Sequence, residues 1–274
     1  MSLSVNNMLG GGGNPEGLHV WKKHNYIDAN VDIVSWAYGT DDQIVAMVNA
    51  ADNGLINLSD FWSVGDERKV TLSAMSATGV GESHAKQTVT FVLMNAGGKT
   101  LARATPSGRT KCSFIVGLKN ALAEEGYMNS SDTVTGGWNG CARRTWCNNV
   151  FRNAIPSTLR GIFKQHLNKT ANGNSSTIST STDYFALPAE KEVFGSNIHA
   201  NSTAEASLRQ FEYYKNDTNL PKKPGDDNVF SLLSWWERSP STVGSNSFCY
   251  VMQGSSSSSS SASKANLLAP FGCI

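Results

Sequence analysis

In the first third of the chain, some apolar residues alternate with polar ones, as in a strand, and others recur every three to four residues, as in a helix. A helical spacing predicts a helix over residues 40–54, which begins with a capping box of Thr40 and Gln43 and ends at Asn53 and Gly54. Aromatic, β-branched or alternating stretches are typical of strands. These strand-like stretches cover residues 17–27 and 29–39, as a hairpin, and residues 67–75 and 86–95.

Helix-like patterns fill the middle of the chain. They cover residues 112–126, 136–170 with a break near Pro156, 187–195 between Pro188 and Gly195, and 202–216. Ser202 and Glu205 form a capping box at the start of the last of these helices. After Pro156, His166 shares a face with Leu159, Ile162 and Phe163, so we expect a packed core histidine rather than a catalytic base.

Three short apolar segments near the C-terminus, separated by Ser, Gly and Pro, predict strands at residues 231–240, 245–254 and 265–274. Strands, then helices, then strands favour an α+β fold over a parallel βαβ sheet. We expect a flexible leader at residues 1–18 and an N-terminal α+β portion with strands and one helix at 19–110. Residues 111–274 would hold the helical middle and the C-terminal strands, packed with 19–110 as one unit.

Composition and charge narrow the classes of protein. Of the 274 residues, 39% are hydrophobic and 16% charged, which is enough apolar material for a core and excludes global disorder. The formal net charge of +1 argues against a nucleic-acid partner bound through phosphate neutralisation. No apolar stretch approaches the length of a transmembrane helix, and the start lacks the pattern of a secretion signal, so we expect no membrane insertion.

Candidate chemistry is sparse. The cysteines are odd in number and irregularly spaced, which is typical of small buried hydrophobes in a reducing compartment; they are Cys112, Cys141, Cys147, Cys249 and Cys273. His84, near Glu82, is the best histidine candidate, but its glycine-rich surroundings predict a solvated loop. Arg143 and Arg144 beside Trp146 could grip an anion, although pairing with carboxylates is the commoner role. We expect no enzyme activity, cofactor or metal, while a Cys–His pair that meets only in space remains open.

Several long motifs carry a resemblance. "SVGDERKVTLSAMSATGVGESH", "GGWNGCARRTWCNNVFRNAIPSTLRGIFKQ", "DYFALPAEKEVFGS" and the series "WWERSP", "FCYV" and "LAPFGCI" resemble a family encoded in phages and prophages of gut Firmicutes. The resemblance covers about residues 19–274. The C-terminal end is similar to the variable region written by diversity-generating retroelements. Known targets of such retroelements, including the phage major tropism determinant, have a C-type-lectin-like fold. The resemblance therefore implies a C-type-lectin-like domain with short C-terminal antiparallel strands and exposed variable loops.

The resemblance implies a ligand-binding variable surface in two intervals between scaffold strands, with the serine run as an exposed loop pinned at both ends. Its residues would be Ser241, Thr242, Val243, Ser245, Ser247, Tyr250, Met252, Ser255, Ser256, Ser257, Ser258, Ser259, Ser260, Ser261, Ser263, Lys264 and Asn266. Adenine-directed diversification would convert Asn codons AAC into Ser codons AGC. Met252, Gln253 and Lys264 depart from that pattern, because AAC cannot become their codons.

These observations predict a non-enzymatic receptor-binding protein, a phage or prophage adhesin that recognises a bacterial surface protein or glycan. We expect a homo-oligomer, most simply a trimer. We expect it on a phage tail together with other tail proteins, or in the bacterial cytoplasm before release. One alternative is a structural particle protein without its own ligand. The other is a lectin-fold enzyme relative that uses cysteines, for which two thiols close together in a cleft with polar neighbours would be the mark.

Overall fold

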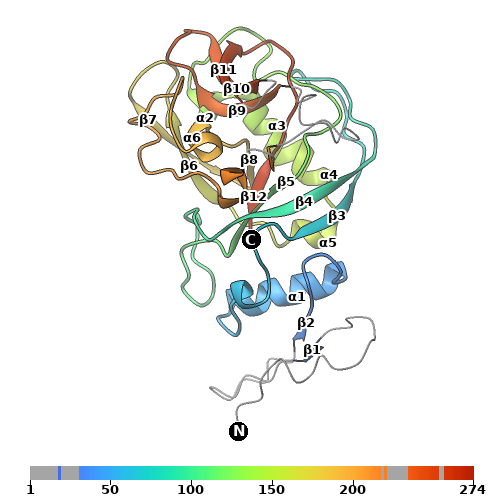
Figure 1. Cartoon of the computed structure of the whole chain (residues 1–274). Coiled ribbons are helices and arrows are strands. Elements are labelled where there is room, and N and C mark those ends of the chain that lie inside the picture. The colour runs from blue at the N-terminus through green and yellow to red at the C-terminus, as the bar shows by residue number, and fades with distance from the viewer. Residues whose placement is uncertain (1–17, 20–30, 217–218, 221–233, 253–255) are drawn as a thin grey trace.

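The computed structural model describes residues 18–19, 31–216, 219–220, 234–252 and 256–274 (Figure 1). The predicted hairpin is present as β1 (Leu18–His19) and β2 (Asp32–Ile33), which pair antiparallel. The residues that connect these two strands lie outside the described part of the chain. The expected leader at 1–18 also lies outside it, apart from Leu18.

The predicted helix is confirmed as α1 (Asp41–Asp52). Its capping box is complete, since the Gln43 amide donates to Thr40 Oγ1 at 3.2 Å and the Thr40 amide donates to Gln43 Oε1 at 2.9 Å. Ile44, Met47 and Val48 are fully buried, as the helical spacing requires. Helix α1 lies at the end of the molecule opposite the C-terminal strands (Figure 1).

An antiparallel five-stranded sheet holds the centre of the fold, and its strand order is β3-β4-β5-β12-β8. The strands are β3 (Glu67–Leu72), β4 (Gln87–Ala96), β5 (Phe114–Leu118), β12 (Phe271–Cys273) and β8 (Phe185–Ala186). Strand β12 lies between β5 and β8, and Phe271 is opposite Gly117 on one side and Ala186 on the other. The expected strands at 67–75, 86–95 and 265–274 are therefore confirmed, each with shorter or slightly shifted bounds.

The predicted helix over residues 112–126 is wrong, because strand β5 occupies its first half. All five β5 residues are buried between β4 and β12. A strand covered on both faces presents a continuous apolar run, and periodicity alone does not distinguish such a run from a buried helix. After β5 the chain continues through bends and turns rather than through a helix.

Short helices follow, and the break predicted near Pro156 is confirmed. They are α2 (Gly137–Gly140), α3 (Ala142–Trp146), a π-helical turn at Cys147–Phe151, α4 (Arg152–Ala154) and, after the proline, α5 (Ser157–Arg160). The helix after Pro156 is shorter than predicted. His166 instead begins β6 (His166–Ala171), which pairs with β7 (Ile178–Asp183). The histidine is nevertheless fully buried, as expected.

Helix α6 (Glu190–Phe194) confirms the prediction for residues 187–195, and Gly195 ends it with a φ of +77°. The predicted helix over 202–216 is wrong, since that segment forms turns and a 3₁₀ helix at Glu212–Lys215. Ser202 and Glu205 do not form the predicted capping box. Its carboxylate lies in the core and accepts hydrogen bonds from the Lys191 amide and the Ser239 hydroxyl.

A three-stranded sheet of order β11-β10-β9 forms the opposite end of the molecule from α1 (Figure 1). Strands β9 (Trp235–Pro240) and β10 (Ser247–Met252) confirm two predicted strands. Strand β11 (Ser256–Ser261) corrects the expectation that the serine run is a loop. Its residues pair one by one with β10, from Ser256 opposite Met252 to Ser261 opposite Ser247. Backbone pairing with β10 thus overrides the weak strand preference of serine.

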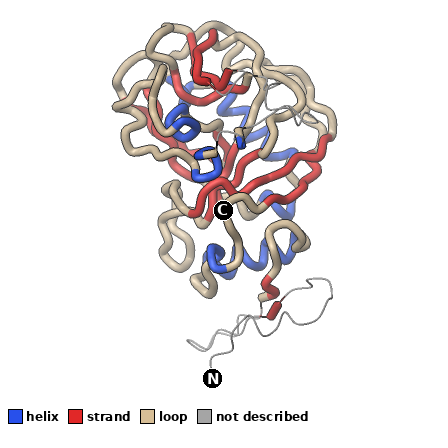
Figure 2. The backbone as a smooth tube through the Cα atoms, in the orientation of Figure 1, coloured by secondary structure: helices blue, strands red, loops and turns tan. Residues whose placement is uncertain are grey.

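One hydrophobic cluster extends from Val34 to Ile274 and joins the two sheets. Helices and mostly antiparallel strands share this core, so the α+β fold class is confirmed. Strands from both sides of the expected boundary at residues 110 and 111 lie in the same five-stranded sheet. Figure 2 shows long loops between short strands around the three-stranded sheet. In the described part of the chain, every helix is too short or too polar to span a bilayer.

Candidate functional site

The expected variable surface maps onto the β10–β11 hairpin, the turn between β9 and β10, and the segment after β11. Exposed members are Thr242, Val243, Ser245, Met252, Ser256 and Lys264, and half-buried members are Tyr250, Ser257, Ser258, Ser259, Ser260, Ser261 and Ser263. Val243 is 71% exposed and Met252 is 40% exposed. Ser255 lies outside the described residues.

Three members of the expected surface are buried, which corrects the prediction that they are exposed. Ser241 and Ser247 are joined by one backbone hydrogen bond, in which the Ser241 amide donates to the Ser247 carbonyl at 2.9 Å, and both residues are buried. Asn266 is 8% exposed because its backbone pairs in both directions with Gly126. These three residues belong to the scaffold that carries the surface.

The hairpin has two faces of different character. Side chains alternate along a strand, so Tyr250 and Met252 lie on one face while Cys249 and Val251 lie on the other. Tyr250 packs edge-on against Trp236, with ring centroids 6.0 Å apart. On the other face, the Ser257 hydroxyl donates a hydrogen bond to the Glu190 carboxylate. The inner face of the hairpin therefore contacts a buried acidic group.

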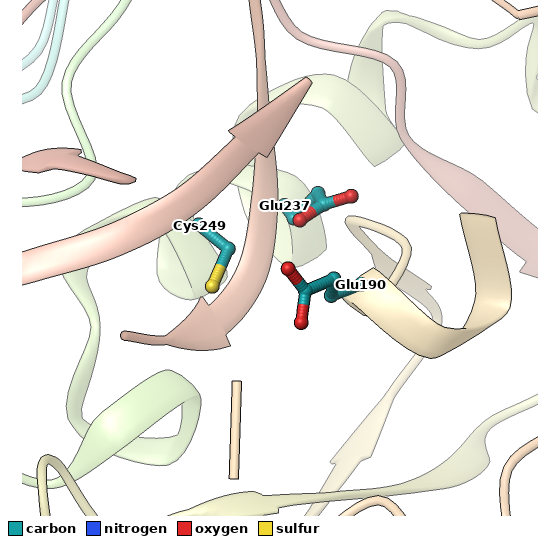
Figure 3. Close-up of side chains that lie close together, drawn as sticks. All are labelled: Glu190, Glu237 and Cys249. Carbon is teal, nitrogen blue, oxygen red and sulfur yellow. The ribbon is translucent and has the colours of Figure 1, made fainter. Parts of the chain in front are cut away.

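That acidic group belongs to a cluster that the sequence reasoning missed. Glu190, Glu237 and Cys249 lie close together on α6, β9 and β10 (Figure 3). Their side-chain oxygen and sulfur atoms lie within 4.8 Å of one another, and all three residues are fully buried. The signal that could have revealed the cluster is a glutamate inside the otherwise aromatic segment "SWWERSP", because unpaired glutamate is rarely buried.

An irregularity in β9 sets the position of Glu237. Trp236 is opposite Tyr250 and Pro240 is opposite Phe248, so three residues of β9 lie across from the single residue Cys249. Bulges of this kind bend a strand and change the direction of its side chains, and they are common beside functional sites. The bulge brings the Glu237 carboxyl and the Cys249 thiol to the same place.

The two carboxyl groups of the cluster have opposite surroundings. Glu190 accepts hydrogen bonds from three successive backbone amides, those of Ile198, His199 and Ala200, at 2.8 to 3.0 Å. Among the residues that the structure describes, neither oxygen of Glu237 has a hydrogen-bond partner. Burial raises the pKa of Glu237 well above its usual value, and the nearby carboxylates of Glu190 and Glu205 raise it further. Both causes favour the protonated, neutral form of the Glu237 carboxyl.

A second buried group of charged side chains lies beside this cluster and includes two cations, Lys99 and Arg238. Glu192 binds Lys99 through one oxygen and Arg238 through the other, at 2.5 Å for Arg238. Burial opposes ionisation of Glu192, but Arg238 and Lys99 outweigh it and lower the pKa of Glu192 to about 2. Glu205, whose pKa is raised by burial, is the fourth buried glutamate. Among the described residues, this part of the core therefore contains four buried glutamates, Glu190, Glu192, Glu205 and Glu237, but two buried cations.

The other candidates from the sequence have structural roles. His84 is 1% exposed, so the predicted solvated loop is wrong; its Nδ1 lies 2.9 Å from Glu124 Oε2. Arg144 pairs with the Asp183 carboxylate at 2.6 Å, as expected. Arg143 does not pair with a carboxylate, because it donates to the backbone carbonyls of Val80 and Tyr127. It fits there because Gly126 has no Cβ, which would collide with the Arg143 guanidinium.

All five cysteines are free and buried, as the sequence predicted. The Cys112 and Cys273 thiols are hydrogen-bonded to each other, and this bond lowers the pKa of Cys112. The pKa of Cys273 is raised, mainly by burial. These thiols meet the proximity condition of the enzyme alternative, but they lie in the core rather than in a cleft, at 2% and 0% exposure.

A surface hollow of about 570 Å³ lies on other elements and is bordered by Asp52, Arg103, Lys164 and Tyr184, among others. Asp52 pairs with Lys164 at 2.5 Å and with Arg109 at 2.7 Å, so its charge is compensated. None of the expected variable residues in the described part of the chain borders this hollow. It is separate from the hairpin surface.

No curated protein and no solved structure matches the chain at a significant level. One family model does match, and its description is "Domain of unknown function (DUF6273)". The match covers residues 115–270, from the second residue of β5 through the three-stranded sheet to the residue before β12. Because the match covers more than half of the sequence, the chain belongs to the DUF6273 family.

Proposed function

We propose that the chain is a non-enzymatic binding protein, a phage- or prophage-encoded adhesin that recognises a receptor on a bacterial surface. The observation that carries this proposal is the position of the serine strand. Strand β11 lies at the edge of the three-stranded sheet, and exposed apolar side chains stand near both ends of the hairpin, at Val243 and Met252. An edge of small polar residues with apolar neighbours offers hydrogen bonds and contact area to a ligand.

The energetic contrast between the surface and its support favours a replaceable binding face. Trp235 and Trp236 on β9 and Phe248 on β10 are fully buried, and truncating such core residues typically destabilises a protein by about 3–5 kcal/mol. Substitution at exposed positions usually changes stability by about 0.5 kcal/mol or less. Thr242, Ser245 and their exposed neighbours can therefore vary while the scaffold persists.

We extend the proposal to the fold and the setting. The domain would be C-type-lectin-like, with β9, β10 and β11 carrying the exchangeable positions and β12 anchoring the region in the larger sheet. The receptor would be a bacterial surface protein or glycan. The protein would act as a homo-oligomer, with a trimer expected, on a phage tail together with other tail proteins. The resemblance of the long sequence motifs supports this setting.

Binding of the purified, fluorescently labelled chain to a panel of gut Firmicutes cells tests the proposal. The test variant is Val243→Asp combined with Met252→Asp, because both side chains are exposed and the added charges should leave the fold intact. The matched control is Tyr38→Asp combined with Ile178→Asp, whose side chains are 81% and 45% exposed and lie on other elements. We expect the test variant to lose at least about ten-fold in binding, and the control to bind like the wild type.

Two results would contradict the proposal in different ways. Wild-type protein that binds no cell in the panel would favour a structural particle protein without its own ligand. Wild-type binding that the hairpin variant leaves unchanged would place the binding face elsewhere on the molecule.

The coding DNA tests diversification separately. We expect AGC codons for the serines of β11 and a near-identical, Asn-rich template nearby. AGT or TCN codons without such a template would refute diversification while leaving the binding assay unaffected.

A further inference from the structure

We propose that Glu190, Glu237 and Cys249 bind one divalent transition-metal ion, with Zn²⁺ as the best fit, in the core beneath the β10–β11 hairpin. This inference is independent of the proposed function, since it concerns the scaffold rather than the exposed surface. Each residue comes from a different element, α6, β9 or β10, and each offers one ligand atom to a common point.

The geometry needs little adjustment to form a metal site. Tetrahedral Zn²⁺ holds thiolate sulfur at about 2.3 Å and carboxylate oxygen at about 2.0–2.2 Å, which places its ligand atoms roughly 3.3–3.7 Å apart. The three ligand atoms here already lie within 4.8 Å of one another. Side-chain movements of roughly 1 Å or less therefore close the site around an ion.

The state of Glu237 is an independent reason to assign a ligand. The side chain is fully buried, and within the described part of the chain both of its carboxyl oxygens lack a hydrogen-bond partner. Buried polar groups are almost always satisfied, because an unsatisfied group loses the hydrogen bonds that water made with it. A cation bound between Glu190, Cys249 and Glu237 would supply that missing partner.

The local charge balance points the same way. With all carboxylates ionised and Cys249 bound as a thiolate, Glu190, Glu192, Glu205, Glu237 and Cys249 carry five negative charges, and the buried cations Lys99 and Arg238 supply two positive charges. A divalent ion lowers the excess of negative charge from three to one. The Glu190 carboxylate is already oriented by three backbone amides, so one ligand is preorganised before the ion arrives.

The ligand types select the class of metal. A thiolate with two carboxylates suits Zn²⁺ and related transition ions, whereas Ca²⁺ and Mg²⁺ prefer oxygen ligands alone. In the metal-free chain, burial raises the pKa values of Glu237 and Cys249 well above their usual values, which favours their protonated forms. Binding forms two metal–oxygen bonds, to Glu190 and Glu237, and one metal–sulfur bond, and any proton held by Glu237 or Cys249 goes to solvent.

The ion would also stabilise the base of the hairpin surface. Glu190 accepts a hydrogen bond from Ser257 of β11, and the His199 amide donates to the same carboxylate. The Thr242 amide in turn donates to the His199 carbonyl at 2.8 Å. An ion on Glu190 would therefore fix both the serine strand and the turn before β10.

Because the site is enclosed, the test refolds the full chain in the presence of Co²⁺ or Zn²⁺ and removes free metal by gel filtration. We expect about one metal ion per chain by mass spectrometry, and with Co²⁺ a near-ultraviolet charge-transfer band from thiolate ligation. Cys249→Ser should abolish that band and weaken metal binding at least about ten-fold. Cys147→Ser, at another fully buried cysteine, is the matched control and should keep both the band and the stoichiometry.

A second variant keeps the test decisive if Cys249→Ser does not fold. Glu237→Gln preserves the side-chain shape, so its folding can be verified by circular dichroism, and it should lose stoichiometric cobalt. The proposal is overturned if the refolded wild type holds no stoichiometric Co²⁺ or Zn²⁺. It is also overturned if folded Cys249→Ser keeps the charge-transfer band, or if Glu237→Gln binds cobalt as the wild type does.

Discussion

Replacing Glu237 with Gln should change how the stability of the metal-free chain depends on pH. In the unfolded chain a glutamate has a pKa of about 4.3, whereas burial raises the pKa of native Glu237 well above its usual value. Above about pH 4.3, therefore, the native state holds one proton that the unfolded state has lost. The free energy of unfolding then falls as pH rises, by about 1.4 kcal/mol per pH unit, until the native pKa is reached.

The difference between wild type and Glu237→Gln isolates this effect, because other titrating groups contribute equally to both proteins. At pH values above about 4.3 and below the native pKa of Glu237, the wild type should lose about 1.4 kcal/mol per pH unit relative to the variant. Urea unfolding followed by circular dichroism, with a chelator present, measures both curves. The chelator is needed because a bound ion would ionise Glu237 and remove the slope.

Glu212→Gln serves as the control, since that carboxylate is about half exposed and pairs with Lys215 across one helical turn. Because this variant retains Glu237, its stability should keep the fall with rising pH that Glu237 produces. If the Glu237→Gln curve also runs parallel to the wild type, the native Glu237 carboxyl is ionised, and the argument from its burial fails.

Three further substitutions test the fold, each by urea unfolding. Thr40→Ala removes the cap of α1 and should destabilise the protein by about 1 kcal/mol, whereas Thr40→Ser should retain most of the stability. Gly272→Ala should destabilise by about 1–3 kcal/mol, because the new Cβ would lie 2.7 Å from Phe163 Cδ1 in the middle of the sheet; an unchanged midpoint would contradict this packing. Lys99→Met should destabilise by about 3 kcal/mol by leaving Glu192 with one cation, and adding Glu192→Gln should recover part of the loss if the pair is the cause.

Elements whose signals lie a few residues apart could be predicted from the sequence. Thr40 and Gln43 are three positions apart and predicted where α1 begins, and Pro188 and Gly195 bounded α6 in the same way. The break at Pro156 follows from the chemistry of proline itself. Such local signals act before the chain has a tertiary structure, and in these three places folding leaves them unchanged. The capping box predicted at Ser202 and Glu205 is the exception, because core contacts of Glu205 override it.

Elements that depend on distant partners could not be predicted in this way. Strand β5 carries an apolar run that suits a buried helix equally well, and only its neighbours β4 and β12 make it a strand. The serines of β11 have little preference for any structure and become a strand because β10 pairs with them. His166 was correctly predicted to be buried, but on a helix rather than on β6.

The buried cluster was missed for the same reason. Glu190, Glu237 and Cys249 are separated by 12 to 59 positions in the sequence, and only the bulge in β9 and the packing of α6 bring them together. The segment that contains Glu237 was predicted to be a strand, which β9 confirms. A charged residue inside a scaffold strand is the feature that should have prompted a search for its partner.

The position of β12 has a consequence for synthesis of the protein. Strand β5 emerges from the ribosome about 150 residues before the strand that pairs with its open edge. At a synthesis rate of roughly 5–20 residues per second, that edge waits roughly 8 to 30 s without its partner. During this interval Phe114–Leu118, a wholly apolar strand in the native core, is free to pair with another nascent chain. Chaperone supply and growth temperature should therefore limit the yield of folded protein more strongly than any change on the hairpin surface.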